Sequence, residues 1–152
     1  MGELGGDLLW WCVHSAAALG MLALVLLAMT VARPDAFAPQ PKLLATLLAF
    51  CVPAVGGALV GWTWARDPRC WPGRFCWVTG VLLLAAVSVW VIGLPTGPGM
   101  CESCTSGEKL VRTFFAFDRG SGLLGGDGLL VGCWAPLALF GYSAGVMLGL
   151  RL

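Results

Sequence analysis

The stretch that decides the fold is Leu8–Ala32, which reads LLWWCVHSAAALGMLALVLLAMTVA and holds 25 residues without an Asp, Glu, Lys or Arg. Three further charge-free stretches of 23, 27 and 23 residues follow it: Leu43–Ala65, Phe75–Cys101 and Gly128–Leu150. A helix rises about 1.5 Å per residue, so each stretch is long enough to cross a hydrocarbon core about 30 Å thick. The sequence therefore predicts an integral, multi-pass membrane protein, and it leaves open which membrane holds it.

The composition agrees with a single membrane domain over residues 1–152. Of these residues, 59% are hydrophobic and 11% are charged, and the mean hydropathy is +0.86. No connection between the spans is long enough for a soluble domain with its own core. The net charge of +1 provides no basic surface, so we expect no nucleic-acid partner. Because Glu3 and Asp7 precede the first stretch where a cleaved signal carries basic residues, we expect this span to be retained.

Prolines and glycines refine the limits of the spans. They interrupt the third stretch after about residue 94, so we expect spans at about 8–32, 43–65, 75–94 and 128–150 and a long loop over 95–127. The connection between spans two and three is short and joins them as an antiparallel hairpin. The two sides of the bundle carry four and five of the nine Lys and Arg residues, so the orientation stays open. Three arginines lie in the short connection between spans two and three, which favours a cytoplasmic position for that connection. Both termini would then also lie in the cytoplasm.

The long loop contains the pattern of a short helix. Thr105, followed three residues later by Glu108, matches a capping box. On a helical wheel the apolar residues that follow share one arc, and most charged residues lie outside it: Glu108, Lys109, Arg112 and Arg119. Such a helix is typical of the bilayer surface. The predicted fold class is therefore an all-α, integral membrane four-helix transmembrane bundle with a short interfacial helix between spans three and four.

Small residues mark the faces on which the helices are expected to pack. Transmembrane helices associate where small side chains let their backbones approach closely. Residues of this kind recur at a spacing of four within single spans: Gly141, Gly145 and Gly149 in the fourth, Gly57 and Gly61 in the second, Ala16 and Gly20 in the first. These faces can serve packing within the bundle or contact with another subunit. Pro53 and Pro136 lie inside the second and fourth spans, where we expect kinks.

The most suggestive motif for chemistry is Cys101-Glu102-Ser103-Cys104. Two cysteines with this spacing at a helix start can form a redox-active disulfide, because the helix amino terminus stabilises a thiolate. The βαβ context that usually accompanies such a motif is missing, so a structural disulfide or two free thiols are the alternatives. A zinc site that combines Cys70 and Cys76 with this pair is not expected, because the two pairs flank opposite ends of span three. We predict no metal site.

His14, the only histidine, lies within the first span. An ionisable group in a membrane span is a candidate functional site. One histidine cannot supply both axial ligands of a haem, so a methionine or a partner subunit would have to supply the second. The alternative that we prefer is a neutral imidazole bonded to a carbonyl or to Ser15, Ser143 or Tyr142 on a facing helix. We therefore predict no cofactor.

The sequence points away from catalysis. The spans carry no carboxylate, lysine or arginine at midplane depth, which disfavours coupled transport by this chain alone. Sets of residues for hydrolysis or nucleotide binding are missing. We therefore expect a non-enzymatic accessory, assembly or structural subunit of a larger membrane complex. Its expected partners are the lipid bilayer and either other membrane proteins or further copies of itself. The alternatives are a thiol–disulfide protein that uses Cys101 and Cys104 and, more weakly, cofactor binding through His14.

Overall fold

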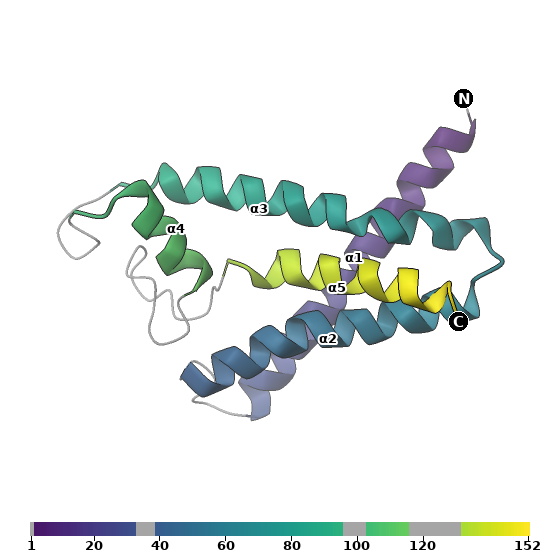
Figure 1. Ribbon diagram of the computed structural model, residues 1–152, viewed down its shortest axis with the longest axis horizontal. Helices are drawn as coiled ribbons and strands as arrows, with labels where there is room; N and C mark the ends of the chain where they lie inside the picture. Colours follow the sequence, from purple (N-terminus) through teal and green to yellow (C-terminus); the bar gives the residue numbers. More distant parts are fainter. Residues whose placement is uncertain (1, 33–38, 96–102, 116–131) are drawn as a thin grey trace.

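The computed structural model describes residues 2–32, 39–95, 103–115 and 132–152. Its helical elements are α1 (Gly2–Ala32), α2 (Pro39–Thr63), the 3₁₀ helix η1 (Pro68–Phe75), α3 (Cys76–Ile92), α4 (Ser106–Phe114) and α5 (Trp134–Gly149). The described residues contain no strand (Figure 1). The predicted fold class of a helical membrane bundle is confirmed, and the chain is an integral membrane protein.

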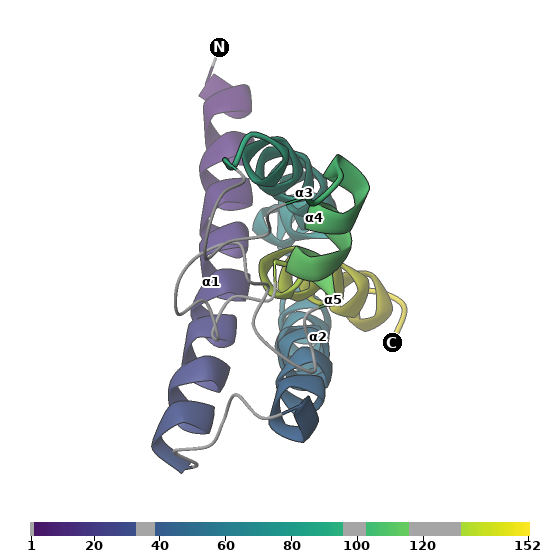
Figure 2. The same cartoon turned by 90° about the vertical axis from the view of Figure 1, so that its left-hand side faces the viewer.

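Helix α5 forms the centre of the molecule. It lies between α2 and α3, and α1 crosses this group obliquely as a separate layer (Figures 1 and 2). Ten residues of α5 are buried, whereas α3 buries only Cys76, Gly80 and Val91. The amino-terminal part of α1, η1 and the end of α5 meet at one end of the bundle, where Asp7 and Leu150 line the same hollow.

The helices differ in how much of a bilayer they can cross. By length and composition, three segments among the described residues can span a membrane: Gly5–Ala32, Lys42–Thr63 and Pro68–Ile92, of 28, 22 and 25 residues. The 31 residues of α1 extend over about 46 Å, which is enough for a strongly tilted helix to reach both sides of the bilayer. Helix α5 has 16 residues and extends over about 24 Å.

Several helix ends differ from the predicted span limits. Helix α2 starts at Pro39, because the first turn of a helix does not need the amide that proline lacks. Helix α1 starts at Gly2 and includes Asp7. Helix α5 starts at Trp134, which puts Pro136 in the first turn, where no kink is needed. The first predicted residues of the fourth span, 128–131, lie outside the described residues.

The predicted glycines of the second and fourth spans meet between α2 and α5. A methyl group added at Gly145 would overlap the carbonyl oxygen of Ala54, and one at Gly141 would overlap that of Phe50. From the other side, a methyl group at Gly61 would lie 2.5 Å from the carbonyl oxygen of Val146. Gly57 and Gly149 face partner backbone in the same way. The two backbones are therefore in direct contact, and any side chain at these positions would push them apart.

Helix α4 lies at the carboxyl end of α3, and the structure corrects one expectation about it. Thr105 caps the helix by accepting a hydrogen bond from the Glu108 amide at 3.3 Å. Lys109, expected on the polar outer face, is instead buried, and its ammonium group donates to the carbonyl oxygens of Leu94 and Ile92. The cation therefore caps the last turn of α3, where unpaired carbonyls carry partial negative charge.

Candidate functional site

Two buried polar side chains, His14 and Ser143, lie against η1, at the end of the bundle where α1 and α5 meet it. The 3₁₀ helix starts after Asp67, whose side chain accepts a hydrogen bond from the Arg69 amide at 2.9 Å. Pro72 lies inside η1 and has no N–H, so it cannot donate to the carbonyl of Arg69 three residues before it. The sequence of η1 thus leaves a partly buried carbonyl that needs a donor from elsewhere in the fold.

His14 supplies that donor. Its Nε2 lies 2.9 Å from the carbonyl oxygen of Arg69, and its Nδ1 lies 2.7 Å from the hydroxyl of Tyr142. A carbonyl oxygen only accepts, so Nε2 carries a proton; in the neutral ring, Nδ1 then accepts a hydrogen bond from the Tyr142 hydroxyl. Both ring nitrogens are engaged. His14 is 3% exposed, and its ring rests on Gly73, where a side chain would lie only 3.2 Å from it.

Two more side chains bind η1 in the same manner. Trp11 of α1 donates from its indole nitrogen to the carbonyl oxygen of Phe75 at 3.2 Å. Ser143 of α5 donates from its hydroxyl to the carbonyl oxygen of Arg74. Together with His14, these donors from α1 and α5 satisfy three carbonyls of η1. We name this arrangement the η1 anchor and define it by the donors His14, Trp11 and Ser143.

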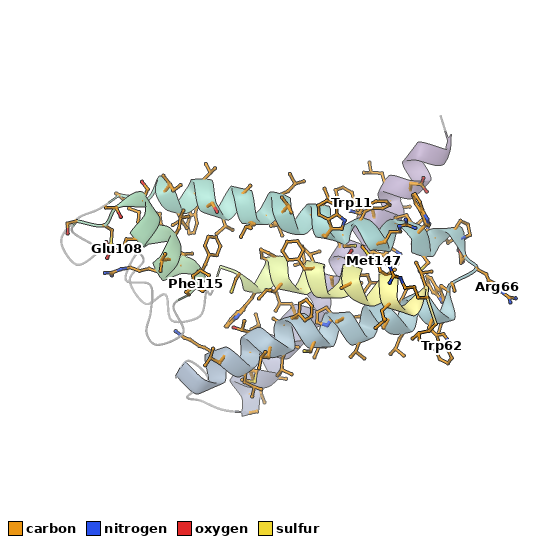
Figure 3. The ribbon with its side chains drawn as sticks, in the orientation of Figure 1. Trp11, Trp62, Arg66, Glu108, Phe115 and Met147 are labelled. Carbon is orange, nitrogen blue, oxygen red and sulfur yellow. The ribbon has the colours of Figure 1, made fainter. Side chains whose placement is uncertain are left out.

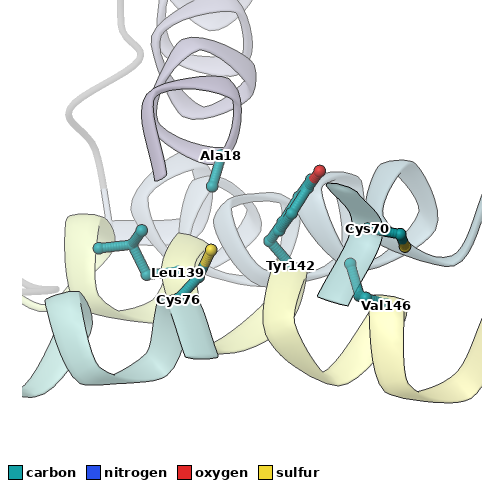
Figure 4. Close-up of a cluster of buried hydrophobic side chains, with 6 residues drawn as sticks. All are labelled: Ala18, Cys70, Cys76, Leu139, Tyr142 and Val146. Atoms are coloured by element: carbon teal, nitrogen blue, oxygen red, sulfur yellow. The ribbon is translucent and has the colours of Figure 1, made fainter. Parts of the chain in front are cut away.

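Apolar side chains and two thiols pack directly beneath the η1 anchor. The cluster consists of Ala18, Cys70, Cys76, Leu139, Tyr142 and Val146, drawn from α1, η1, α3 and α5 (Figure 4). The hydroxyl of Ser15 lies 3.1 Å from that of Thr79 and donates to the Cys76 sulfur at 3.8 Å. Cys70 and Cys76 are buried free thiols. Both behave here as small core residues, because a buried thiol in apolar surroundings is inert.

The outer side of η1 carries the charged groups of this end. The guanidinium group of Arg69 lies 5.3 Å from the centre of the Trp10 ring, and that of Arg74 lies 4.4 Å from the centre of the Trp71 ring. Trp62 and Arg66 lie at the same end of the molecule, far from Glu108 on α4 and from Phe115 directly after it (Figure 3). Tryptophan and arginine together are typical of the headgroup level of a bilayer.

The predicted site residues fall into three separate places. His14 belongs to the η1 anchor, and the five glycines lie between α2 and α5. Cys104 lies beside the start of α4 and is disulfide-bonded, whereas Cys101 lies outside the described residues. Within the described part of the chain, no three His, Cys, Asp or Glu residues form a group that could hold a metal ion.

Sequence reasoning allowed a carbonyl or Tyr142 as the partner of His14, but it missed that the carbonyl belongs to η1 and that Trp11 and Ser143 bind two more carbonyls there. The signal was present in Pro72, whose missing amide frees the carbonyl three residues before it. It also missed the bond from the Trp134 indole nitrogen to the Thr46 hydroxyl, 2.8 Å long, which joins α5 to α2 at the other end of the molecule. Comparison of the chain with protein-family models, with curated proteins and with solved structures found no match in any of the three.

Proposed function

We propose that this small membrane protein is a non-enzymatic accessory or assembly subunit that packs against other membrane proteins. The main support is the use of the polar side chains around η1. His14, Trp11 and Ser143 each form a hydrogen bond to a backbone carbonyl of the same chain. Among the described residues, no buried side-chain nitrogen or oxygen lacks a partner. Groups that are bonded in this way hold a fold together, and they are not poised to bind a substrate.

The outward face of α1 is the surface that we propose for a partner. Because α1 crosses the other helices obliquely, much of its length is exposed, including Ala16, Gly20 and Ala23. A methyl group added at Gly20 would meet nothing within 4 Å, in contrast to the glycines between α2 and α5. Small residues spaced along one face allow another helix to approach closely. This face therefore has the features of a helix-packing surface, and no described part of the chain covers Gly20.

Gentle detergent extraction followed by native electrophoresis tests the proposal. We expect the wild-type protein to migrate in a complex larger than a monomer. Gly20→Leu should shift it to the monomer position, because the added side chain fills the proposed contact. Ala85→Leu is the matched control, since Ala85 is also exposed but lies on α3. Migration of the wild type as a lone monomer, or an equal effect of both variants, would contradict the proposal.

A thiol–disulfide function is the second candidate, and one observation favours it. Cys104 is disulfide-bonded and directly precedes Thr105, the amino-terminal cap of α4. A helix amino terminus stabilises a thiolate and so favours exchange. In this proposal, the Cys101–Cys104 pair accepts two electrons and two protons from a partner dithiol, which becomes a disulfide. Because thiol–disulfide exchange is reversible, Cys101→Ser leaves the Cys104 thiolate free to attack the partner in its disulfide form, and no second thiol of the pair remains to resolve the product. Cys101→Ser should therefore trap a mixed disulfide between Cys104 and the partner on a non-reducing gel, whereas Cys12→Ser should not. Unchanged function in the double cysteine variant would contradict this role.

A further inference from the structure

A second feature at the η1 end is a hollow of about 350 Å³ between η1, the start of α3 and the end of α5. It is lined by Arg74, Phe75, Trp77, Met147, Leu150 and Arg151. Two of these residues are cationic, four are apolar, and none is acidic. The two arginines come from separate elements, so the fold brings two positive charges to one apolar hollow.

Neither guanidinium group is neutralised within the described part of the chain, where the ion pair between Arg112 and Glu108 is the only one found. Arg74 is held in place by its neighbours: its guanidinium group lies over Trp71, and its carbonyl is bound by Ser143 of the η1 anchor. Arg151 is exposed directly after α5. A guanidinium group presents a planar fork of N–H donors that matches the oxygens of a phosphate.

The apolar walls of the hollow continue into the surface that faces lipid. Trp77 and Met147 are 43% and 41% exposed, and Leu148, which follows Met147 in the sequence, is 57% exposed. A free phosphate ion would use only the two arginines, whereas a phospholipid would cover both the charges and these apolar side chains. Tryptophan next to arginine also sets the depth of the hollow at the headgroup level.

We propose that this hollow binds one anionic phospholipid, with its phosphate between Arg74 and Arg151 and its acyl chains along Trp77 and Met147. A zwitterionic lipid fits less well, because its cationic group would share the site with two arginines. The carboxyl end of α5 carries partial negative charge that opposes an anion. Both guanidinium groups are therefore needed to hold the phosphate. The proposal does not depend on the subunit role proposed above.

Native mass spectrometry of the purified full-length protein tests it, with phosphatidylglycerol and phosphatidylcholine of identical acyl chains as probes. We expect the wild type to retain phosphatidylglycerol in preference to phosphatidylcholine. Arg74→Gln and Arg151→Gln should each lower the affinity for phosphatidylglycerol about fivefold, the contribution of one interfacial arginine to anionic-lipid binding. The Arg74 side chain can be replaced without touching the bond that its carbonyl accepts from Ser143.

Arg66→Gln is the matched control, because it removes the same charge but lines two other hollows. Arg66→Gln should leave the preference for phosphatidylglycerol unchanged. Arg74→Lys keeps the positive charge and should retain part of the affinity for phosphatidylglycerol that Arg74→Gln loses. Soluble glycerol phosphate serves as a competitor that carries the headgroup phosphate without acyl chains, and it should not displace the lipid at millimolar concentration. Equal retention of the two lipids, an equal loss in Arg66→Gln, or full displacement by glycerol phosphate would overturn the proposal.

Discussion

The hydroxyl of Tyr142 lies 2.7 Å from Nδ1 of His14 and joins α5 to α1 across 128 positions of sequence. This bond completes a chain of contacts that runs from Tyr142 through the imidazole to the carbonyl of Arg69 in η1. The carbonyl fixes the tautomer of His14, and the tautomer fixes the direction in which the Tyr142 hydroxyl donates. The imidazole ring of His14 therefore links α1 to both α5 and η1.

Tyr142→Phe should destabilise the protein, because the variant leaves Nδ1 of His14 buried without a donor. The expected loss in the free energy of unfolding is about 1 kcal/mol, between the average for hydrogen bonds in membrane proteins and the cost of an unsatisfied buried group. Reversible unfolding in detergent measures it. The double-mutant cycle with His14→Phe should show that the two losses are not additive. An unchanged midpoint in Tyr142→Phe would mean that the bond does not stabilise the fold.

Gly145→Ala should lower the stability by about 1–3 kcal/mol, because the added methyl group would collide with the Ala54 backbone and force α2 and α5 apart. Gly107→Ala provides the comparison, since the same change at Gly107 on α4 meets open space and lies away from the proposed partner face of α1. It should cause no loss and can raise stability through the higher helix propensity of alanine. Thermal unfolding of both variants in the same detergent measures the difference. Equal midpoints would show that the close approach of α2 and α5 is not required.

Lys109→Met should loosen the junction of α3 and α4, because the last carbonyls of α3 lose their cationic cap. Hydrogen exchange followed by mass spectrometry should show faster exchange in α4 and in the last turn of α3, with little change in α5. Arg112→Ala is the control from the same helix. Its ion pair with Glu108 is nearly half exposed and should contribute only a few tenths of a kcal/mol. If both variants exchange alike, Lys109 is not the cap that its contacts indicate.

The sequence allowed some of these features to be predicted because their causes are local. Thr105 and Glu108 start α4 through contacts between near neighbours. The burial of Lys109 could not be predicted, because its bonds reach Leu94 and Ile92, 15 and 17 positions earlier. A helical wheel treats a charged residue as exposed, whereas the fold uses this one to pair carbonyls that the end of another helix leaves free.

The candidate site also has one feature that the sequence reveals and others that depend on the fold. His14 was recognisable as a buried polar group, because it lies inside an apolar stretch. Arg69 was not recognisable as its partner, because the atom involved is a backbone carbonyl whose availability depends on the 3₁₀ geometry of η1. The convergence of Arg74 and Arg151 on one hollow likewise depends on how α5 and η1 are placed.

By itself, the sequence determined that this protein lies in a membrane as a helical bundle. Long runs without charge can satisfy their backbone amides in lipid only as helices, and that requirement acts on each segment separately. Only the tertiary structure decided that α5 is central, that α1 crosses it at a tilt, and which carbonyl His14 binds. Those outcomes depend on which surfaces meet. Close contact of two glycine faces and the pairing of freed carbonyls are properties of two segments together.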